Sequence, residues 1–214
     1  MSGSRPQTPA EAWRELLAGN GRFVSGDVQH PNQDAARRAD IAGGQRPFAT
    51  FFGCSDSRVA AEVIFDQGLG DLFVIRTAGH VVGPTELGSM EFGAEVLDIP
   101  LIVVLGHDSC GAVGATMEAV ESGTMPKGLI RDLVQRIMPS VVAGKHQGMT
   151  SVDELMAEHV RQTVNLIVER STRCAERVED GRLAIVGLTY TLADGRASIA
   201  EVVGDIGESP APTH

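Results

Sequence analysis

Short, continuous apolar runs in the middle of the chain predict the strands of a buried sheet. These runs cover residues 48–52, 72–75 and 101–105 and are rich in Phe, Val and Ile. Runs without polar alternation are typical of parallel strands that are buried on both faces. Helical patterns at 85–97 and 112–121 separate them. This order of strands and helices predicts an α/β domain with a mostly parallel central β-sheet flanked by helices.

The second half of the chain predicts a long helix followed by a hairpin. Ser151 and Glu154 form a capping box, and we expect the helix that they open to continue to about residue 178 with one apolar stripe. Apolar runs at 183–191 and 197–203 flank the letters ADGR. A short Gly-containing turn between two such runs indicates a β-hairpin.

The start of the chain is polar except for one apolar stripe. The letters TPAE form a capping box that opens a helix bearing Trp13 and Leu16, and Asp34 is placed to cap a second, short helix. An arm of this kind must bury its apolar face, and a partner subunit is the surface that we expect to cover it. The predicted divisions of the chain are an N-terminal helical arm (1–45), an α/β domain (46–206) and a flexible tail (207–214).

Composition and charge exclude several classes of partner. Of the 214 residues, 43% are hydrophobic and 21% are charged, which is ordinary for a globular protein. The net charge of −10 argues against nucleic acid, whose binding needs a basic surface. No stretch approaches the roughly 20 apolar residues of a membrane span, and no secretory signal is evident. We therefore expect a cytoplasmic protein, in which three widely spaced cysteines do not form a disulfide scaffold.

Two of the predicted strands end in residues that bind metals. Cys54 follows the first run and has Asp56 two residues on, while His107 follows the third run and has Cys110 three residues on. Both clusters fall at the carboxyl edge of the sheet, where α/β proteins bind ligands. Two thiolates and an imidazole suit tetrahedral Zn²⁺ and leave a fourth position for water. Asp56 could occupy that position or hold the zinc-bound hydroxide, and Arg58 is placed to pair with it.

Each of these residues also has a plainer interpretation. A cysteine at the end of a buried strand is commonly a packing residue, and Asp56 with Arg58 resembles a surface ion pair. A structural zinc site would need a fourth ligand, and Cys174 is the one remaining cysteine. It lies in the apolar stripe of the long helix, so we interpret it as a packing thiol. His80 has no partner cluster in the sequence, and His159 is interpreted as a surface or hydrogen-bonded histidine.

Together the motifs resemble those of β-class carbonic anhydrases. The segments FGCSDSRV, GDLFVIRTAG and VLGHDSCGAV carry the resemblance, which extends from the helical arm to the letters GLTY near position 190. It implies reversible hydration of CO₂ to bicarbonate and a proton by a zinc-bound hydroxide. It also implies a dimer or tetramer in which the N-terminal helices embrace the neighbouring subunit.

The resemblance implies a role for each residue of the site. Asp56 and Arg58 correspond to the catalytic dyad, in which Asp56 is a fourth zinc ligand only in a closed state at low pH. The ligands of one zinc per subunit would be Cys54, His107 and Cys110. The substrate-binding residues would be Gln45 from the partner chain, the pocket aromatics Phe73 and Phe92, and the backbone N–H of Gly111.

Three further positions bear on regulation. Some members of the family bind an inhibitory bicarbonate through a Trp, an Arg and a Tyr. Here Arg76 and Tyr190 occupy the last two positions, but Phe51 replaces the Trp, which argues against such a site. Two other functions stay open: hydrolysis of COS or CS₂ with the same ligands, and a non-catalytic zinc or thiol sensor, which would have no use for the Asp–Arg dyad.

Overall fold

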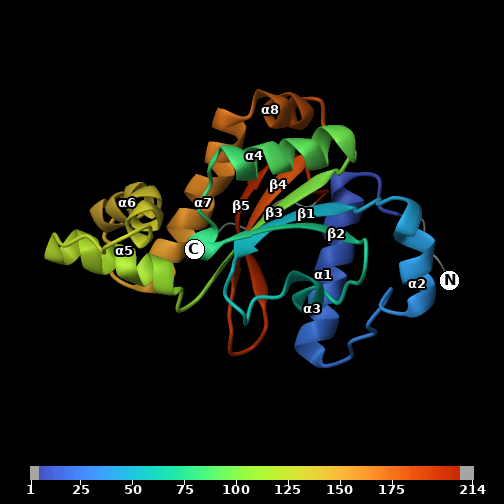
Figure 1. Cartoon of the computed structure of the whole chain (residues 1–214), viewed down its shortest axis with the longest axis horizontal. Coiled ribbons are helices and arrows are strands. Elements are labelled where there is room, and N and C mark those ends of the chain that lie inside the picture. The colour runs from blue at the N-terminus through green and yellow to red at the C-terminus, as the bar shows by residue number, and fades with distance from the viewer. Residues whose placement is uncertain (1–4, 208–214) are drawn as a thin grey trace.

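A five-stranded sheet forms the centre of the molecule (Figure 1). The computed structural model describes residues 5–207. The strand order is β2-β1-β3-β4-β5, in which β4 and β5 are antiparallel and every other neighbouring pair is parallel. The strands are β1 (Ala49–Cys54), β2 (Leu72–Thr77), β3 (Leu101–His107), β4 (Ala184–Tyr190) and β5 (Ala197–Val203). The predicted α/β class and the hairpin are confirmed.

Helices surround this sheet in the order expected for an α/β domain. In Figure 1, α5 and α6 lie together at one end of the molecule and α2 lies at the other. The α-helices are α1 (Pro9–Ser25), α2 (Ala35–Asp40), α3 (Ala61–Ile64), α4 (Pro84–Glu91), α5 (Gly111–Ser122), α6 (Ile130–His146), α7 (Val152–Arg170) and α8 (Thr172–Glu179). Shorter helical turns are η1 (Ile41–Gly43), η2 (Ala78–His80) and η3 (Phe92–Val96).

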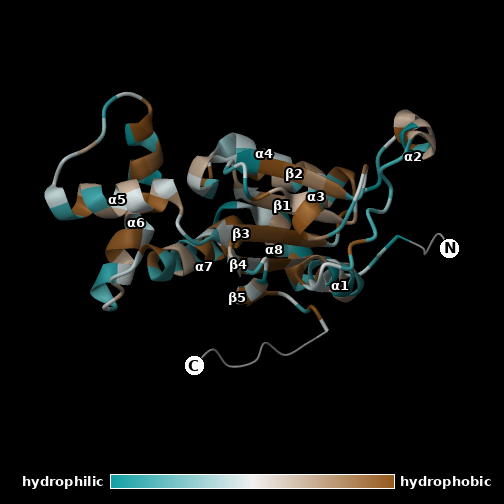
Figure 2. Cartoon of the chain, turned by 90° about the horizontal axis from the view of Figure 1, so that it is seen from below, coloured by the Kyte–Doolittle hydropathy of each residue, from teal (hydrophilic) through white to brown (hydrophobic). Residues whose placement is uncertain are grey.

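Two hydrophobic cores pack on opposite faces of the sheet, because successive side chains of a strand point to opposite sides. Phe52 and Val104 face the core formed by helices α4 to α8. Phe51 and Val103 face the smaller core under α1 and α3. Figure 2 shows strands β1, β2 and β3 largely as hydrophobic ribbon. Burial on both faces explains why β1 and β3 have no polar alternation.

The N-terminal helix packs on its own chain. Thr8 and Glu11 form the predicted capping box, and Trp13 and Leu16 are 3% and 1% exposed within the smaller core. For Trp13 and Leu16, the expectation that a partner subunit covers the stripe is therefore corrected, because residues of the chain's own sheet pack against them. The short helix α2, capped by Asp34 as predicted, has no buried residue. Both α2 and Leu17 of α1, which is 42% exposed, remain available to a partner.

The strand β2 is less buried than the sequence suggested. It lies at the edge of the sheet, and its residues are half-buried or exposed, with Val74 36% exposed. The apolar run had predicted burial on both faces. An edge strand with apolar side chains and one unpaired side is suited to contact with another chain.

Two predicted helices are interrupted. The expected helix at 85–97 ends its regular part at Glu91 and continues as the π-helical turn η3. The expected helix from 151 to about 178 breaks at Ser171, which ends α7 and caps α8 through its hydroxyl.

Within residues 5–207, no helix is long and apolar enough to cross a membrane. The predicted tail, apart from Gly207, lies outside the described residues.

Candidate metal centre

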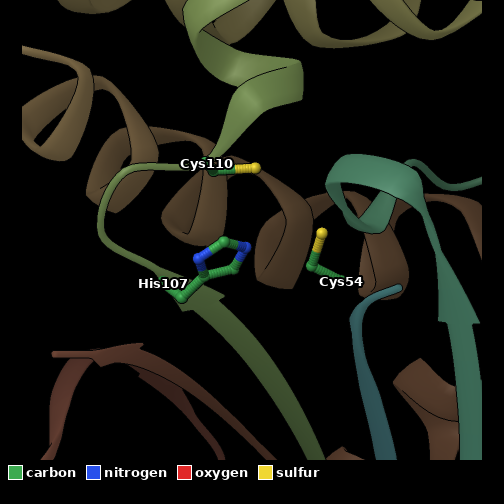
Figure 3. Close-up of side chains that lie close together, drawn as sticks. All are labelled: Cys54, His107 and Cys110. Atoms are coloured by element: carbon green, nitrogen blue, oxygen red, sulfur yellow. The ribbon is translucent and has the colours of Figure 1, made fainter. Parts of the chain in front are cut away.

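Three side chains from two neighbouring strands and the following loop converge at the carboxyl edge of the sheet. Cys54 is the last residue of β1, His107 is the last residue of β3, and Cys110 is the residue that precedes α5. The strands pair directly, so their ends lie side by side. The two sulfurs and a ring nitrogen of His107 all lie within 4.8 Å of one another (Figure 3). The structure thus brings together the ligand set that the sequence predicted.

The orientation of His107 suits a metal ligand. Its side chain is fully buried, and Nδ1 lies 2.8 Å from the backbone oxygen of Asp108. Because a carbonyl oxygen only accepts hydrogen bonds, Nδ1 carries the proton and Nε2 keeps its lone pair. Among the described residues, Nε2 has no hydrogen-bond partner. A buried lone pair without a partner, beside two thiols, fits a zinc ion held by two sulfurs and one nitrogen.

The two thiols shift each other's pKa in opposite directions. The pKa of Cys54 lies well below its usual range, mainly because Cys110 donates a hydrogen bond to it, with smaller contributions from His107 and from the Gly79 N–H, 3.3 Å from Sγ. The pKa of Cys110 is raised in turn, first by the same hydrogen bond and then by burial. A cation held by both sulfurs would displace the thiol protons, because metals bind the thiolate form.

Asp56 and Arg58 form the close pair that the sequence predicted. Oδ1 of Asp56 accepts hydrogen bonds from the backbone N–H and the Nε–H of Arg58, both at 2.9 Å, and Oδ2 accepts one from Nη2 at 2.7 Å. These bonds hold the pKa of Asp56 far below its usual range. Oδ2 also lies 3.9 Å from Nε2 of His107, so the carboxylate borders the metal cluster.

Known proteins similar to this chain agree on one family. The family model described as carbonic anhydrase matches residues 49–197. Carbonic anhydrase 2 of Mycobacterium tuberculosis is 55% identical over 200 residues, which cover 94% of this chain and 97% of that protein. The carbonic anhydrase of Mycolicibacterium smegmatis is 54% identical over the same shares. The chain belongs to the β-class carbonic anhydrase family.

Solved structures of β-class carbonic anhydrases share the fold. A structure from a study of two tetrameric enzymes of the ascomycete Sordaria macrospora matches with a TM-score of 0.69 and 20% identity, over 87% of this chain and 95% of the other. A Coccomyxa enzyme, solved in complex with acetazolamide, matches with a TM-score of 0.69 and 22% identity, over 88% and 87%. The arrangement of sheet and helices is therefore that of the β-class.

The three positions considered for a regulatory bicarbonate site have other contacts. Arg76 donates to the backbone oxygens of Cys54 at 2.9 Å and Asp56 at 2.6 Å, so its guanidinium holds the segment that carries the metal cluster. Phe51 and Tyr190 are both buried in the smaller core. The engagement of Arg76 with backbone oxygens supports a structural role for this residue.

The residues assigned to substrate binding divide into two groups. Gly111 begins α5 beside Cys110, and a side chain there would meet no atom of residues 5–207 within 4 Å, so this backbone borders open space in the described part of the chain. Phe73 and Phe92 lie near each other, with ring centroids 6.1 Å apart. However, Phe73 pairs with Thr50 near the start of β1, whereas Cys54 ends that strand.

Gln45 lies on the same side of the molecule as the two aromatics. It is exposed and precedes β1, whereas the cluster follows the last residue of that strand. The six residues of β1 separate these ends by about 16 Å at roughly 3.3 Å per residue. The structure therefore does not bring Gln45, Phe73 and Phe92 to the metal cluster of their own chain.

A buried histidine pair behind the cluster was missed as part of the site. His80 and His159 are 0% and 5% exposed, and their ring centroids lie 4.3 Å apart. The interpretation of His159 as a hydrogen-bonded histidine is confirmed, since both of its ring nitrogens have partners. One signal in the sequence could have found His80: it follows shortly after the predicted strand that neighbours β1. Cys174 lies in the larger core, as predicted, and takes no part in the cluster.

Proposed function

We propose that this chain catalyses the reversible hydration of CO₂ to bicarbonate and a proton, with one zinc ion held by Cys54, His107 and Cys110. The observation that carries the proposal is the buried Nε2 of His107, which has no hydrogen-bond partner among residues 5–207 and lies within 4.8 Å of two thiols at the sheet edge. Membership of the β-class carbonic anhydrase family supports the reaction. When bound at such a site, zinc acts as a Lewis acid that lowers the pKa of a coordinated water to about 7.

The part of Asp56 in this reaction is to orient the attacking water. Arg58 donates hydrogen bonds to both oxygens of the Asp56 carboxylate from one side. The carboxylate can therefore accept one further hydrogen bond on the side that faces the metal. A hydrogen bond from the water to Asp56 would turn an oxygen lone pair toward the carbon of CO₂. In this proposal Arg58 keeps the carboxylate ionised and directed, and the Gly111 N–H contacts substrate oxygen.

A second subunit completes the substrate pocket in this proposal. Gln45, Phe73 and Phe92 lie away from the cluster of their own chain, so they would serve the site of a partner. The edge strand β2 and the side chains of Phe92 and Val96, which are 44% and 64% exposed, offer an apolar surface for it. Similarity to a structure from a study of tetrameric enzymes supports a homo-oligomer, either a dimer or a tetramer.

Stopped-flow CO₂ hydration by metal-quantified protein tests the proposed function. Activity that scales with bound zinc and disappears on chelation is expected. Turnover of COS or CS₂ without CO₂ hydration would assign the second enzymatic alternative. Zinc binding without turnover of any of the three substrates would instead indicate a non-catalytic sensor. Either of these two results would overturn the proposal.

A further inference from the structure

A buried turn contacts the cluster from behind. The turn η2 (Ala78–His80) follows β2, and the Thr77 hydroxyl closes it by donating to the backbone oxygen of Val81 at 3.0 Å. Inside the turn, the Gly79 N–H donates to Sγ of Cys54 at 3.3 Å. A hydrogen bond to a ligand sulfur changes how strongly that sulfur donates electron density to a metal. The position of this one backbone amide therefore bears on the metal site.

Packing leaves Gly79 little freedom. Its φ of +66° lies in the left-handed region, which favours glycine. A Cβ atom here would lie 2.7 Å from Cβ of Ala112 and 2.8 Å from Cδ1 of Ile137. Ala112 belongs to the first turn of α5, directly after the ligand Cys110. The turn is thus wedged between the helix that follows Cys110 and the helix α6.

A histidine fixes the other side of Gly79. Nε2 of His159 lies 3.0 Å from the Gly79 backbone oxygen, and Nδ1 lies 3.0 Å from Oγ of Ser140. The carbonyl only accepts, so Nε2 carries the proton and Nδ1 accepts from the Ser140 hydroxyl. Burial lowers the pKa of His159 to about 4, which keeps the ring neutral near neutrality. The ring is therefore held in one tautomer.

The peptide held in this way joins Gly79 to His80. The His80 ring is fully buried 4.3 Å from that of His159, and neither of its nitrogens has a partner among residues 5–207. His80 itself has a positive φ of 41°, a strained value for a residue with a side chain. A strained turn with an unpartnered histidine depends on its remaining contacts. On the side of α7, the side chain of His159 contacts the backbone of this turn through its hydrogen bond to the Gly79 oxygen.

We propose that His159, oriented by Ser140, is a positioning residue for the metal ligand Cys54. It holds the Gly79–His80 peptide so that the Gly79 N–H stays directed at the Cys54 sulfur. The chain of contacts runs from the Ser140 hydroxyl through the His159 ring and Gly79 to Sγ, with no link longer than 3.3 Å. The inference rests on the proposed zinc site, and it adds His159 and Ser140, which reach the ligand Cys54 through Gly79.

Four variants of the full-length protein separate this role from simple packing. His159→Leu removes the donor, and His159→Asn keeps an amide that is too short to reach Gly79. His159→Gln places an N–H close to the position of Nε2 and should restore the contact. Thr163→Val is the matched control, because Thr163 is 4% exposed on the same helix and its hydroxyl donates to the His159 backbone oxygen, at 2.7 Å.

The deciding readout is the thiolate-to-cobalt charge-transfer band of the cobalt-loaded proteins. Loss of an N–H donor raises the energy of the sulfur lone pair, so His159→Leu and His159→Asn should move the band to longer wavelength. In the same variants, the zinc dissociation constant should rise at least about tenfold by chelator competition. His159→Gln and Thr163→Val should keep the wild-type band, with dissociation constants within about threefold of wild type.

An unchanged band in folded His159→Leu and His159→Asn overturns the proposal, whatever their zinc affinity. If neither variant folds, ¹⁵N shifts of His159 in the wild-type protein decide, and a proton on Nδ1 instead of Nε2 overturns the proposal. A wild-type protein that binds cobalt without any thiolate band would contradict the metal site itself. The failure of the positioning role and the failure of the proposed function are therefore distinct results.

Discussion

Replacing Arg58 with alanine separates orientation of the Asp56 carboxylate from metal binding. The change removes two of the three hydrogen bonds that Arg58 donates to Asp56, including the 2.7 Å bond from Nη2, and leaves the backbone N–H at 2.9 Å. Oδ2 of Asp56 already lies 3.9 Å from Nε2 of His107. A freed carboxylate is therefore within reach of a metal held by His107. We expect it to compete with water for that metal.

The expected effect is large on turnover and small on stability. A misplacement of about 1 Å in a reacting group costs on the order of 10²-fold in rate, so kcat for CO₂ hydration should fall by at least that factor. The Arg58 side chain is 53% exposed, and exposed ion pairs contribute little to folding. Zinc content should stay at one per chain, because none of the three ligands has changed.

Arg182→Ala provides the matched control for this measurement. Arg182 forms a 2.7 Å ion pair with Asp180, also two residues away, and its side chain is 54% exposed. Both variants should melt at similar temperatures, and only Arg58→Ala should lose activity in stopped-flow assays. Arg58→Lys, which keeps the charge but not the two-pronged geometry, should fall between them. Wild-type turnover in zinc-loaded Arg58→Ala would refute the assignment of the dyad.

Three further predictions concern the fold. Trp13→Ala should lower the free energy of unfolding by about 3–5 kcal/mol in urea denaturation, because Trp13 is 3% exposed in the core of its own chain; a negligible loss would contradict that packing. Gly79→Ala should cost about 1–3 kcal/mol in thermal melts of the metal-free protein, since its Cβ would lie 2.7 Å from that of Ala112, and an unchanged melt would contradict this contact. Burial lowers the pKa of His159 to about 4, so the unfolded chain takes up a proton below about pH 6.5 that the folded chain resists. Stability should therefore fall from pH 6.5 toward 4, and this slope should flatten in His159→Gln; an equal slope in both proteins would contradict the assignment.

The sheet and the ligand cluster could be predicted because their signals are local. The runs that became β1 and β3 are buried on both faces, so they contain no polar alternation, and each ends in a ligand. Parallel strands place their carboxyl ends at one edge, which brings Cys54 to His107 without knowledge of any side-chain contact. The spacing of the motifs then predicted that Cys110 and the Asp56–Arg58 pair lie beside these two ligands.

Features that depend on tertiary contacts could not be predicted in the same way. The break at Ser171 is hidden in the sequence because the apolar stripe continues across it, from Ile167 to Cys174, both fully buried. The hydroxyl of Ser171 bonds to Glu91, 80 residues away. The helix α6 was not predicted either, since it has no side-chain cap at Leu129 and contains a proline.

The arm and the histidine pair show the same limit. The sequence predicted that an apolar stripe on the first helix must be buried, but it could not say that the chain's own sheet would bury it. The contact of His159 with Gly79 spans 80 residues and involves a backbone oxygen, which no spacing rule detects. Motifs therefore reveal the groups that react, whereas the groups that support them are visible only in the folded chain.

Titration of zinc into metal-free protein, followed by stopped-flow CO₂ hydration, tests the central claim most directly. The account predicts no hydration above the buffer rate without metal, and a linear rise that stops at one zinc per chain. Cys54→Ser, carried through the same titration, should bind zinc more weakly and shift the curve. Full activity without zinc, or zinc uptake at one per chain with no gain in hydration, would contradict the account.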